Sequence, residues 1–111
     1  MADFSRSDRV GAQIRRDISV LVHQAVRDGG LPSVSVSDVE INRELEVATV
    51  YVTALIGDEG PTAVTELNNL AKEFRRSLAQ SMSMRRVPEI RFRYDDSVDR
   101  GERIEQLLRD S

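Results

Sequence analysis

The sequence contains no cysteine and no tryptophan, and it has one histidine, His23, among 111 residues. Without cysteine the chain forms no disulfide bonds and has neither thiolate metal sites nor a cysteine nucleophile. The single histidine excludes histidine-rich zinc sites, and a serine–histidine–aspartate triad would have to use His23. No apolar run approaches the roughly 20 residues that a membrane-spanning helix needs, and the polar N-terminus does not resemble a signal peptide. We therefore expect a cytoplasmic protein without a membrane segment or a cofactor.

The length and composition fit one domain. At roughly 100–200 residues per domain there is no room for a second one, so we expect a single domain over residues 1–111. Apolar residues make up 40% of the chain and charged residues 32%, which supports one modest core and is too apolar for a disordered chain. A monomer is the simplest expectation.

Basic and acidic residues are segregated along the chain, although its net charge is −3. Residues 5–16 contain four arginines against one aspartate, and residues 72–93 contain seven basic residues against two glutamates. A local positive field can steer a polyanion despite a negative total. Every basic residue except Lys72 is arginine, which pairs bidentately with phosphate and suits RNA. Codon bias in a GC-rich genome explains the same excess of arginine, so the two interpretations stay open.

The first third of the chain has the pattern of an amphipathic helix. Apolar residues spaced by three and four predict this helix over residues 7–27, with Arg9 and Arg16 on the pole opposite the apolar face. Asp28 and two following glycines end the helix, since glycine readily takes the left-handed cap conformation.

A β-hairpin follows the first helix. Residues 34–41 and 47–55 are rich in β-branched residues and predict two strands, the second of them central in the sheet. The short polar turn at residues 42–46 joins them, and a slip of the alternation at Asp38 predicts a bulge or a late strand start.

The second half predicts a helix, a strand and another helix. Apolar residues spaced by three and four predict one long helix over residues 61–86, closed by Arg85 and Arg86. Strict alternation predicts a strand over residues 89–94, and a helix follows over residues 98–109. The order αββαβα predicts an α+β fold, with the helices packed on one face of a three-stranded sheet. The long helix acts as a crossover, which favours one parallel pair of strands and hence a mixed sheet.

Neither a catalytic nor a base-stacking constellation is evident. Asp95, Asp96 and Asp99 could hold magnesium for a small nuclease, but one acidic turn is better explained as a helix cap. Four of the five aromatic residues fall on apolar faces, which predicts that they belong to the core and do not stack on bases. These residues are Tyr51, Phe74, Phe92 and Tyr94.

Four segments occur in an order and at a spacing that point to one known family. They are Arg6-x-x-Arg9-Val10 with Ile14-x-Arg16-Asp17-Ile18, Val39-x-Ile41-x-Arg43-x-Leu45-x-x-Ala48-x-Val50-Tyr51-Val52-Thr53, Arg85-x-Val87-Pro88-Glu89-Ile90-x-Phe92-x-Tyr94-Asp95-x-Ser97, and Gly101 with Arg103-Ile104 and Leu107-Leu108. Over nearly its whole length the chain resembles ribosome-binding factor A, a bacterial factor in maturation of the small ribosomal subunit.

The resemblance implies a fold and a function. The fold is similar to KH domains of the second topological type, in which two of the three strands are parallel. The implied function is that of a non-enzymatic assembly factor, which binds the immature small subunit and its ribosomal RNA near the decoding region. The family assists processing of the 5′ end of that RNA and is linked to growth in the cold.

One departure from the family pattern concerns a kinked helix pair around Ala-x-Gly. The corresponding residues here are Ala71-Lys72-Glu73, so the alanine is kept and the glycine is not. Glycine helps a kink, and Glu73 should favour a straighter helix and place an anion beside the RNA site. Whether the helix kinks therefore stays open.

We expect the RNA contacts to come from the basic segments and from the position of the Ala-x-Gly motif. The residues are Arg6, Arg9, Arg16, Ala71, Lys72, Arg75, Arg76, Arg85, Arg86, Arg91 and Arg93. The alternative is an adaptor that binds chiefly a ribosomal protein or an assembly GTPase, because the rest of the chain is acidic. That alternative predicts that charge reversal at Glu40, Glu44 and Glu46 weakens binding more than loss of Arg75 and Arg76 does.

Overall fold

The computed structural model describes residues 6–82 and 86–96 of the chain. Within these residues the elements follow the order α, β, β, 3₁₀, α, α, β. Their bounds are α1 Arg6–Arg27, β1 Val34–Ile41, β2 Val47–Ala54, η1 Gly57–Glu59, α2 Gly60–Asn69, α3 Ala71–Ser81 and β3 Glu89–Tyr94. The helix expected over residues 98–109 lies outside the described residues.

The three strands form a mixed sheet in the order β1-β2-β3, with β2 in the centre as predicted. β1 and β2 are antiparallel, and their register shifts between Val36 and Asp38, which confirms the bulge. β2 and β3 are parallel, because the helices between them carry the chain back along the sheet. The predicted α+β class, the mixed sheet and its one parallel pair are therefore confirmed.

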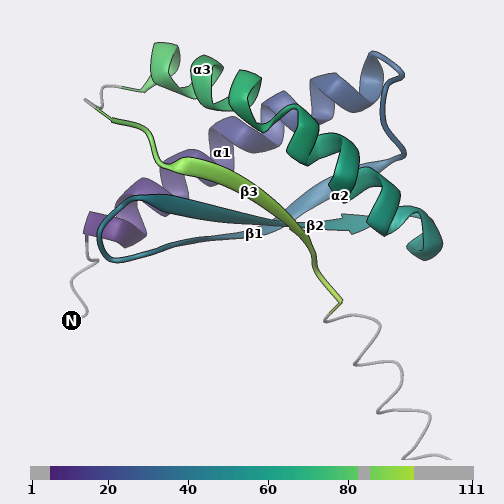
Figure 1. Cartoon of the computed structure of the whole chain (residues 1–111), viewed down its shortest axis with the longest axis horizontal. Coiled ribbons are helices and arrows are strands. Elements are labelled where there is room, and N and C mark those ends of the chain that lie inside the picture. The colour runs from purple at the N-terminus through teal and green to yellow at the C-terminus, as the bar shows by residue number, and fades with distance from the viewer. Residues whose placement is uncertain (1–5, 83–85, 97–111) are drawn as a thin grey trace, which may run out of the picture.

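α1, α2 and α3 lie on one face of the sheet, and no described element covers the other face (Figure 1). The core lies between the two layers, where Phe74 of α3 packs edge-on against Phe92 of β3 with ring centroids 5.7 Å apart. The other buried side chains include Ile14, Ile18, Val22, Ala48, Val50, Val52, Leu67, Leu78 and Ile90. Alternate residues of β2 and β3 point into this core and to the open face.

The prediction of one long helix over residues 61–86 was wrong. The chain forms two helices separated at Leu70, and α3 ends at Ser81, so Arg86 follows the helix and does not close it. Leu70 has φ −96° and ψ 0°, and its N–H donates to the oxygen of Leu67 at 3.0 Å, a tighter 3₁₀-type bond. Apolar residues keep the helical spacing across the break, so their pattern does not reveal it.

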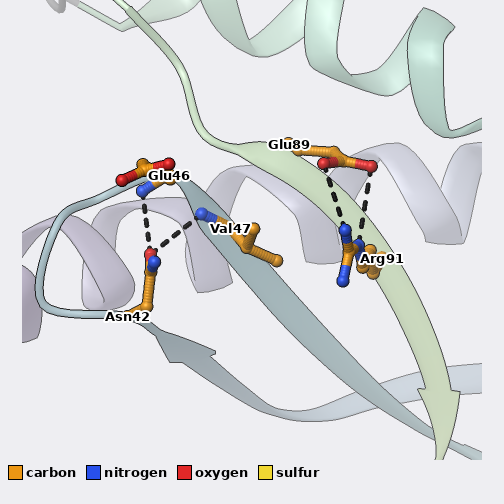
Figure 2. A network of polar contacts seen from close by, with 5 residues as sticks. All are labelled: Asn42, Glu46, Val47, Glu89 and Arg91. Carbon is orange, nitrogen blue, oxygen red and sulfur yellow. Dashed lines mark hydrogen bonds and ion pairs between the residues drawn. The ribbon is translucent and has the colours of Figure 1, made fainter.

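The turn after α1 and the turn of the hairpin lie where the sequence predicts them. Gly29 has φ +83°, the left-handed conformation expected after α1. In the hairpin turn, Asn42 Oδ1 accepts hydrogen bonds from the backbone N–H groups of Glu46 (2.8 Å) and Val47 (2.9 Å) (Figure 2). The Glu46 oxygen accepts from Glu89 N–H at 2.8 Å, which connects this turn to the start of β3.

Candidate nucleic-acid interface

Three of the predicted contacts lie on α1. Arg6, Arg9 and Arg16 are exposed, because the buried side of this helix is occupied by apolar residues and Gly11. The Arg16 guanidinium donates a 2.8 Å hydrogen bond to the side chain of Gln13, a neutral partner that leaves its charge uncompensated.

A groove runs between the N-terminal half of α1 and the edge of β1. Arg9 and Arg15 line one wall, and Asp38 and Glu40 line the other, so its charge is mixed. Arg15 donates a 3.0 Å hydrogen bond to the Ser37 oxygen at the bulge, which makes Arg15 a structural tie between helix and strand.

α3 carries the second group of predicted contacts, and the structure separates their roles. Lys72 and Arg76 are exposed side chains at a spacing of four residues on one side of the helix. Ala71 is half-buried and packs against the core, which leaves only part of its side chain for contact with RNA. Arg75 is exposed as a residue, but its Nε donates to the Val87 oxygen at 3.0 Å.

Two further predicted RNA contacts, Arg85 and Arg86, belong to the connection between α3 and β3. Arg86 is exposed just before the buried residues Val87 and Pro88. Arg85 lies outside the described residues.

Arg91 and Arg93 do not join the cations of the helices. Both are exposed on β3, where Ile90 and Phe92 point into the core and the arginines point to the open face of the sheet. Arg91 lies 3.4 Å from the carboxylate of Glu89 in an ion pair between two exposed side chains (Figure 2). The predicted site is therefore divided between the helical layer and the opposite face of the sheet.

The assignment of Tyr51, Phe74, Phe92 and Tyr94 to the core was partly wrong. Phe74 and Phe92 are buried, as predicted. Tyr51 is half-buried and stands in register with Arg93 of β3 on the open face, where its hydroxyl donates to Glu40 at 3.2 Å. β2 is apolar at alternate positions only, and Tyr51 belongs to the other set.

Among the described residues, no acidic side chain forms an ion pair with a cation of the helices. Within residues 6–82 and 86–96, the ion pair Arg91–Glu89 is the one that joins two described residues. Arg9, Lys72 and Arg76 therefore have no described carboxylate within ion-pair distance. Such charges remain available to an anionic partner.

The acidic cluster has a structural role in part. Asp95 accepts a 2.6 Å hydrogen bond from the Ser37 hydroxyl, and its N–H donates to the Val52 oxygen at 2.8 Å. Asp99 and the helix that the cluster was expected to cap lie outside the described residues. Among the residues that the structure describes, no group of three or more acidic or histidine side chains could hold a metal ion. No described helix is long and apolar enough to cross a membrane.

Comparison with known proteins identifies the family. The sequence model of ribosome-binding factor A matches residues 6–108. Ribosome-binding factor A of Xanthomonas axonopodis pv. citri is 60% identical over 107 residues, covering 96% of this chain and 82% of the relative. The chain belongs to the ribosome-binding factor A family. The factor from Stenotrophomonas maltophilia is 56% identical over 107 residues, covering 96% of this chain and 84% of its own length.

Solved structures of ribosome-binding factor A share the fold. The crystal structure from Thermus thermophilus has a TM-score of 0.70 at 27% identity and covers 81% of this chain and 97% of its own. A homology model of the Thermus factor, fitted into a cryo-EM map of a 30S complex, has a TM-score of 0.67 at 28% identity, covering 79% of this chain and 93% of that one. The resemblance on which the sequence analysis relied is thereby confirmed.

Membership of the ribosome-binding factor A family bears on the break between α2 and α3. The family's Ala-x-Gly corresponds to Ala71-Lys72-Glu73 here, and the helix nevertheless breaks at Leu70. A glycine at position 73 is therefore not needed for the break. Sequence reasoning missed the residues that hold this region, above all Asn68, because a single asparagine in a helical pattern carries no sign of its distant partner.

Proposed function

We propose that the chain binds the immature small ribosomal subunit through ribosomal RNA and assists its late maturation, including processing of the RNA 5′ end. Family membership and the 30S complex of the Thermus relative support binding to the small subunit. The chain holds an RNA conformation and makes or breaks no bond. Ribosomal proteins and an assembly GTPase are further partners of such a factor.

Exposed cations on two helices that share one layer carry this proposal. α1 and α3 contact each other on the same face of the sheet (Figure 1). We assign the phosphate contacts to those predicted cations of these helices that are exposed, have no described ion-pair partner and do not bond to another element. They are Arg6, Arg9, Arg16, Lys72 and Arg76. Guanidinium groups suit this task because they donate two parallel hydrogen bonds to a phosphate.

Fractionation of cell ribosomes on a sucrose gradient tests the proposal with Arg76→Glu and the control Arg43→Glu. Arg43 is an exposed arginine of the hairpin turn, so the change of charge is identical and the location differs. We expect the wild type and Arg43→Glu on free small subunits, absent from translating ribosomes, and Arg76→Glu at the top of the gradient.

Each other outcome rejects a defined part of the proposal. Wild type at the top of the gradient would reject binding to the small subunit. Equal binding of both variants would reject the choice of contacts on α3. Loss of binding in an Arg91→Glu/Arg93→Glu variant alone would move the RNA surface to the open face of the sheet. Loss on charge reversal at Glu40, Glu44 and Glu46 alone would favour the protein-binding alternative.

A further inference from the structure

α2 and α3 are each attached to the β3 segment by a side chain, on either side of the break at Leu70. Asn68 lies in the last turn of α2, and Arg75 lies in the second turn of α3. Both side chains bond to backbone groups of the chain segment that forms or precedes β3. The orientation of one helix relative to the other is thus tied to the sheet at two points.

Asn68 pairs with both backbone groups of Phe92. Its Nδ2 donates to the Phe92 oxygen at 3.1 Å, and its Oδ1 accepts from Phe92 N–H at 2.9 Å. Glu89 and Asp95 donate their N–H groups to the neighbouring β2 side, so the backbone groups of Phe92 point toward the free edge of β3. The carboxamide therefore takes the place of a fourth strand at this position.

Arg75 provides the second attachment. Its Nε donates to the Val87 oxygen at 3.0 Å, and Val87 is only 4% exposed. The bond therefore joins α3 to a well-packed point of the chain before β3. Lys72 and Arg76 follow the orientation of α3, because one lies three residues before Arg75 and the other directly after it.

The break joins the end of α2 directly to the start of α3. The Leu70 N–H makes one 3₁₀-type bond to Leu67, and Phe74 N–H then donates to the Leu70 oxygen at 3.0 Å to start the next helix. α3 therefore starts from the end of α2 that Asn68 holds, and its direction is set by tertiary contacts, namely the Arg75 bond and the buried side chains Phe74 and Leu78.

We propose that Asn68 and Arg75 are positioning residues for binding of the small subunit, because they hold α3 at the angle that presents Lys72 and Arg76 to RNA. This inference rests on the function proposed above. Because both polar groups of the Asn68 side chain bond to Phe92, we assign it no direct contact with RNA. Its effect on affinity passes through the two cations of α3.

The affinity of the full chain for purified immature small subunits tests this role in Asn68→Ala, with Asn69→Ala as the matched control. Asn69 is the next residue of the same helix and is exposed. We expect about tenfold weaker binding for Asn68→Ala, because two hydrogen bonds that orient the helix are lost, and wild-type binding for Asn69→Ala. Hydrogen exchange of the Phe92 amide should accelerate in Asn68→Ala alone.

A double-mutant cycle separates positioning from general stability. In a Lys72→Ala/Arg76→Ala background, Asn68→Ala should cause no further loss of affinity, because the groups that it positions are gone. Additive losses would overturn the proposal, as would wild-type affinity in Asn68→Ala when the Phe92 amide exchanges faster. Arg75→Lys, which keeps a donor near Val87, should bind more tightly than Arg75→Ala.

Two further results keep the test decisive. If Asn68→Ala does not fold, Asn68→Asp and Asn69→Asp form a second matched pair, because both add the same charge and the first keeps the acceptor for Phe92 N–H. Equal affinity of that pair would overturn the proposal. If Lys72→Ala/Arg76→Ala binds like the wild type, the proposed RNA surface fails, whereas the response of the Phe92 amide to Asn68→Ala does not depend on that surface.

Discussion

At the scale of single residues, two buried glycines differ in the space that a side chain would find. Gly60 begins α2 against the ring of Tyr94, the last residue of β3. A Cβ atom at Gly60 would lie 2.7 Å from two ring carbons of Tyr94, closer than real side chains approach. Gly11 on α1 faces Ile41, and a Cβ there would lie 3.9 Å from it, an ordinary contact.

These two glycines should respond oppositely to the same substitution. Gly60→Ala should lower the free energy of unfolding by about 1–3 kcal/mol, since the Tyr94 ring must shift. Gly11→Ala should leave it unchanged or raise it by up to about 1 kcal/mol, since alanine is the better helix former. Urea denaturation measures both, and a Gly60→Ala variant as stable as Gly11→Ala would contradict the close contact.

At the scale of elements, polar side chains bond to backbone groups of neighbouring elements and turns. Arg15 bonds to the outer edge of β1 at Ser37, and Asn68 bonds to the outer edge of β3 at Phe92. The hairpin turn depends in the same way on Asn42, whose Oδ1 holds two backbone N–H groups (Figure 2). α1, α2 and the hairpin turn are thus each placed by a polar side chain as well as by the apolar core.

The hairpin turn should lose stability when Asn42 loses its acceptor. Asn42→Ala should reduce the free energy of unfolding by about 1–2 kcal/mol, because two hydrogen bonds to exposed backbone groups are removed. Asn42→Asp keeps an acceptor oxygen and should retain most of the stability, and Arg43→Ala in the same turn serves as the control. Thermal unfolding followed by circular dichroism measures the series, and equal melting temperatures would show that the turn does not need Asn42.

At the scale of the whole molecule, the uneven distribution of charge outweighs the net charge. The chain carries −3 overall, yet exposed cations without a described ion-pair partner lie on α1 and α3. Arg91 and Arg93 occupy the opposite face, so one flat surface of RNA does not reach all the predicted contacts at once. Binding through the helical layer should therefore depend on few phosphates.

The salt dependence of RNA binding should report the number of phosphate contacts. Five phosphate contacts predict a slope of about −3.5 to −4.5 for log K against log salt, or roughly a 100- to 500-fold loss from 50 to 200 mM. Lys72→Ala/Arg76→Ala should make the slope shallower by about 1.4 to 1.8, and Arg43→Ala should leave it unchanged. Binding isotherms at several salt concentrations measure the slopes. A wild-type slope near zero would contradict phosphate contacts on the helices.

The local elements could largely be predicted because their causes are local. The period of apolar residues marks α1 and the strands, Gly29 marks the end of α1, and the slip at Asp38 marks the bulge. The two cationic segments were equally visible in the sequence. The position of Tyr51 was not, because a β-branched, apolar strand looks alike on both faces until its register with its neighbours is known.

The sequence by itself determined the family, the class of fold and the order of most elements, and it marked the arginine-rich segments that we propose for contact with RNA. Each of these follows from residues that are close together along the chain. Only the tertiary structure decided that the helix breaks at Leu70, that Asn68 and Arg75 attach its two parts to β3, and that the predicted cations lie on two faces. Those features depend on pairs such as Asn68 and Phe92, which are 24 residues apart and meet only when the core brings the helices onto the sheet.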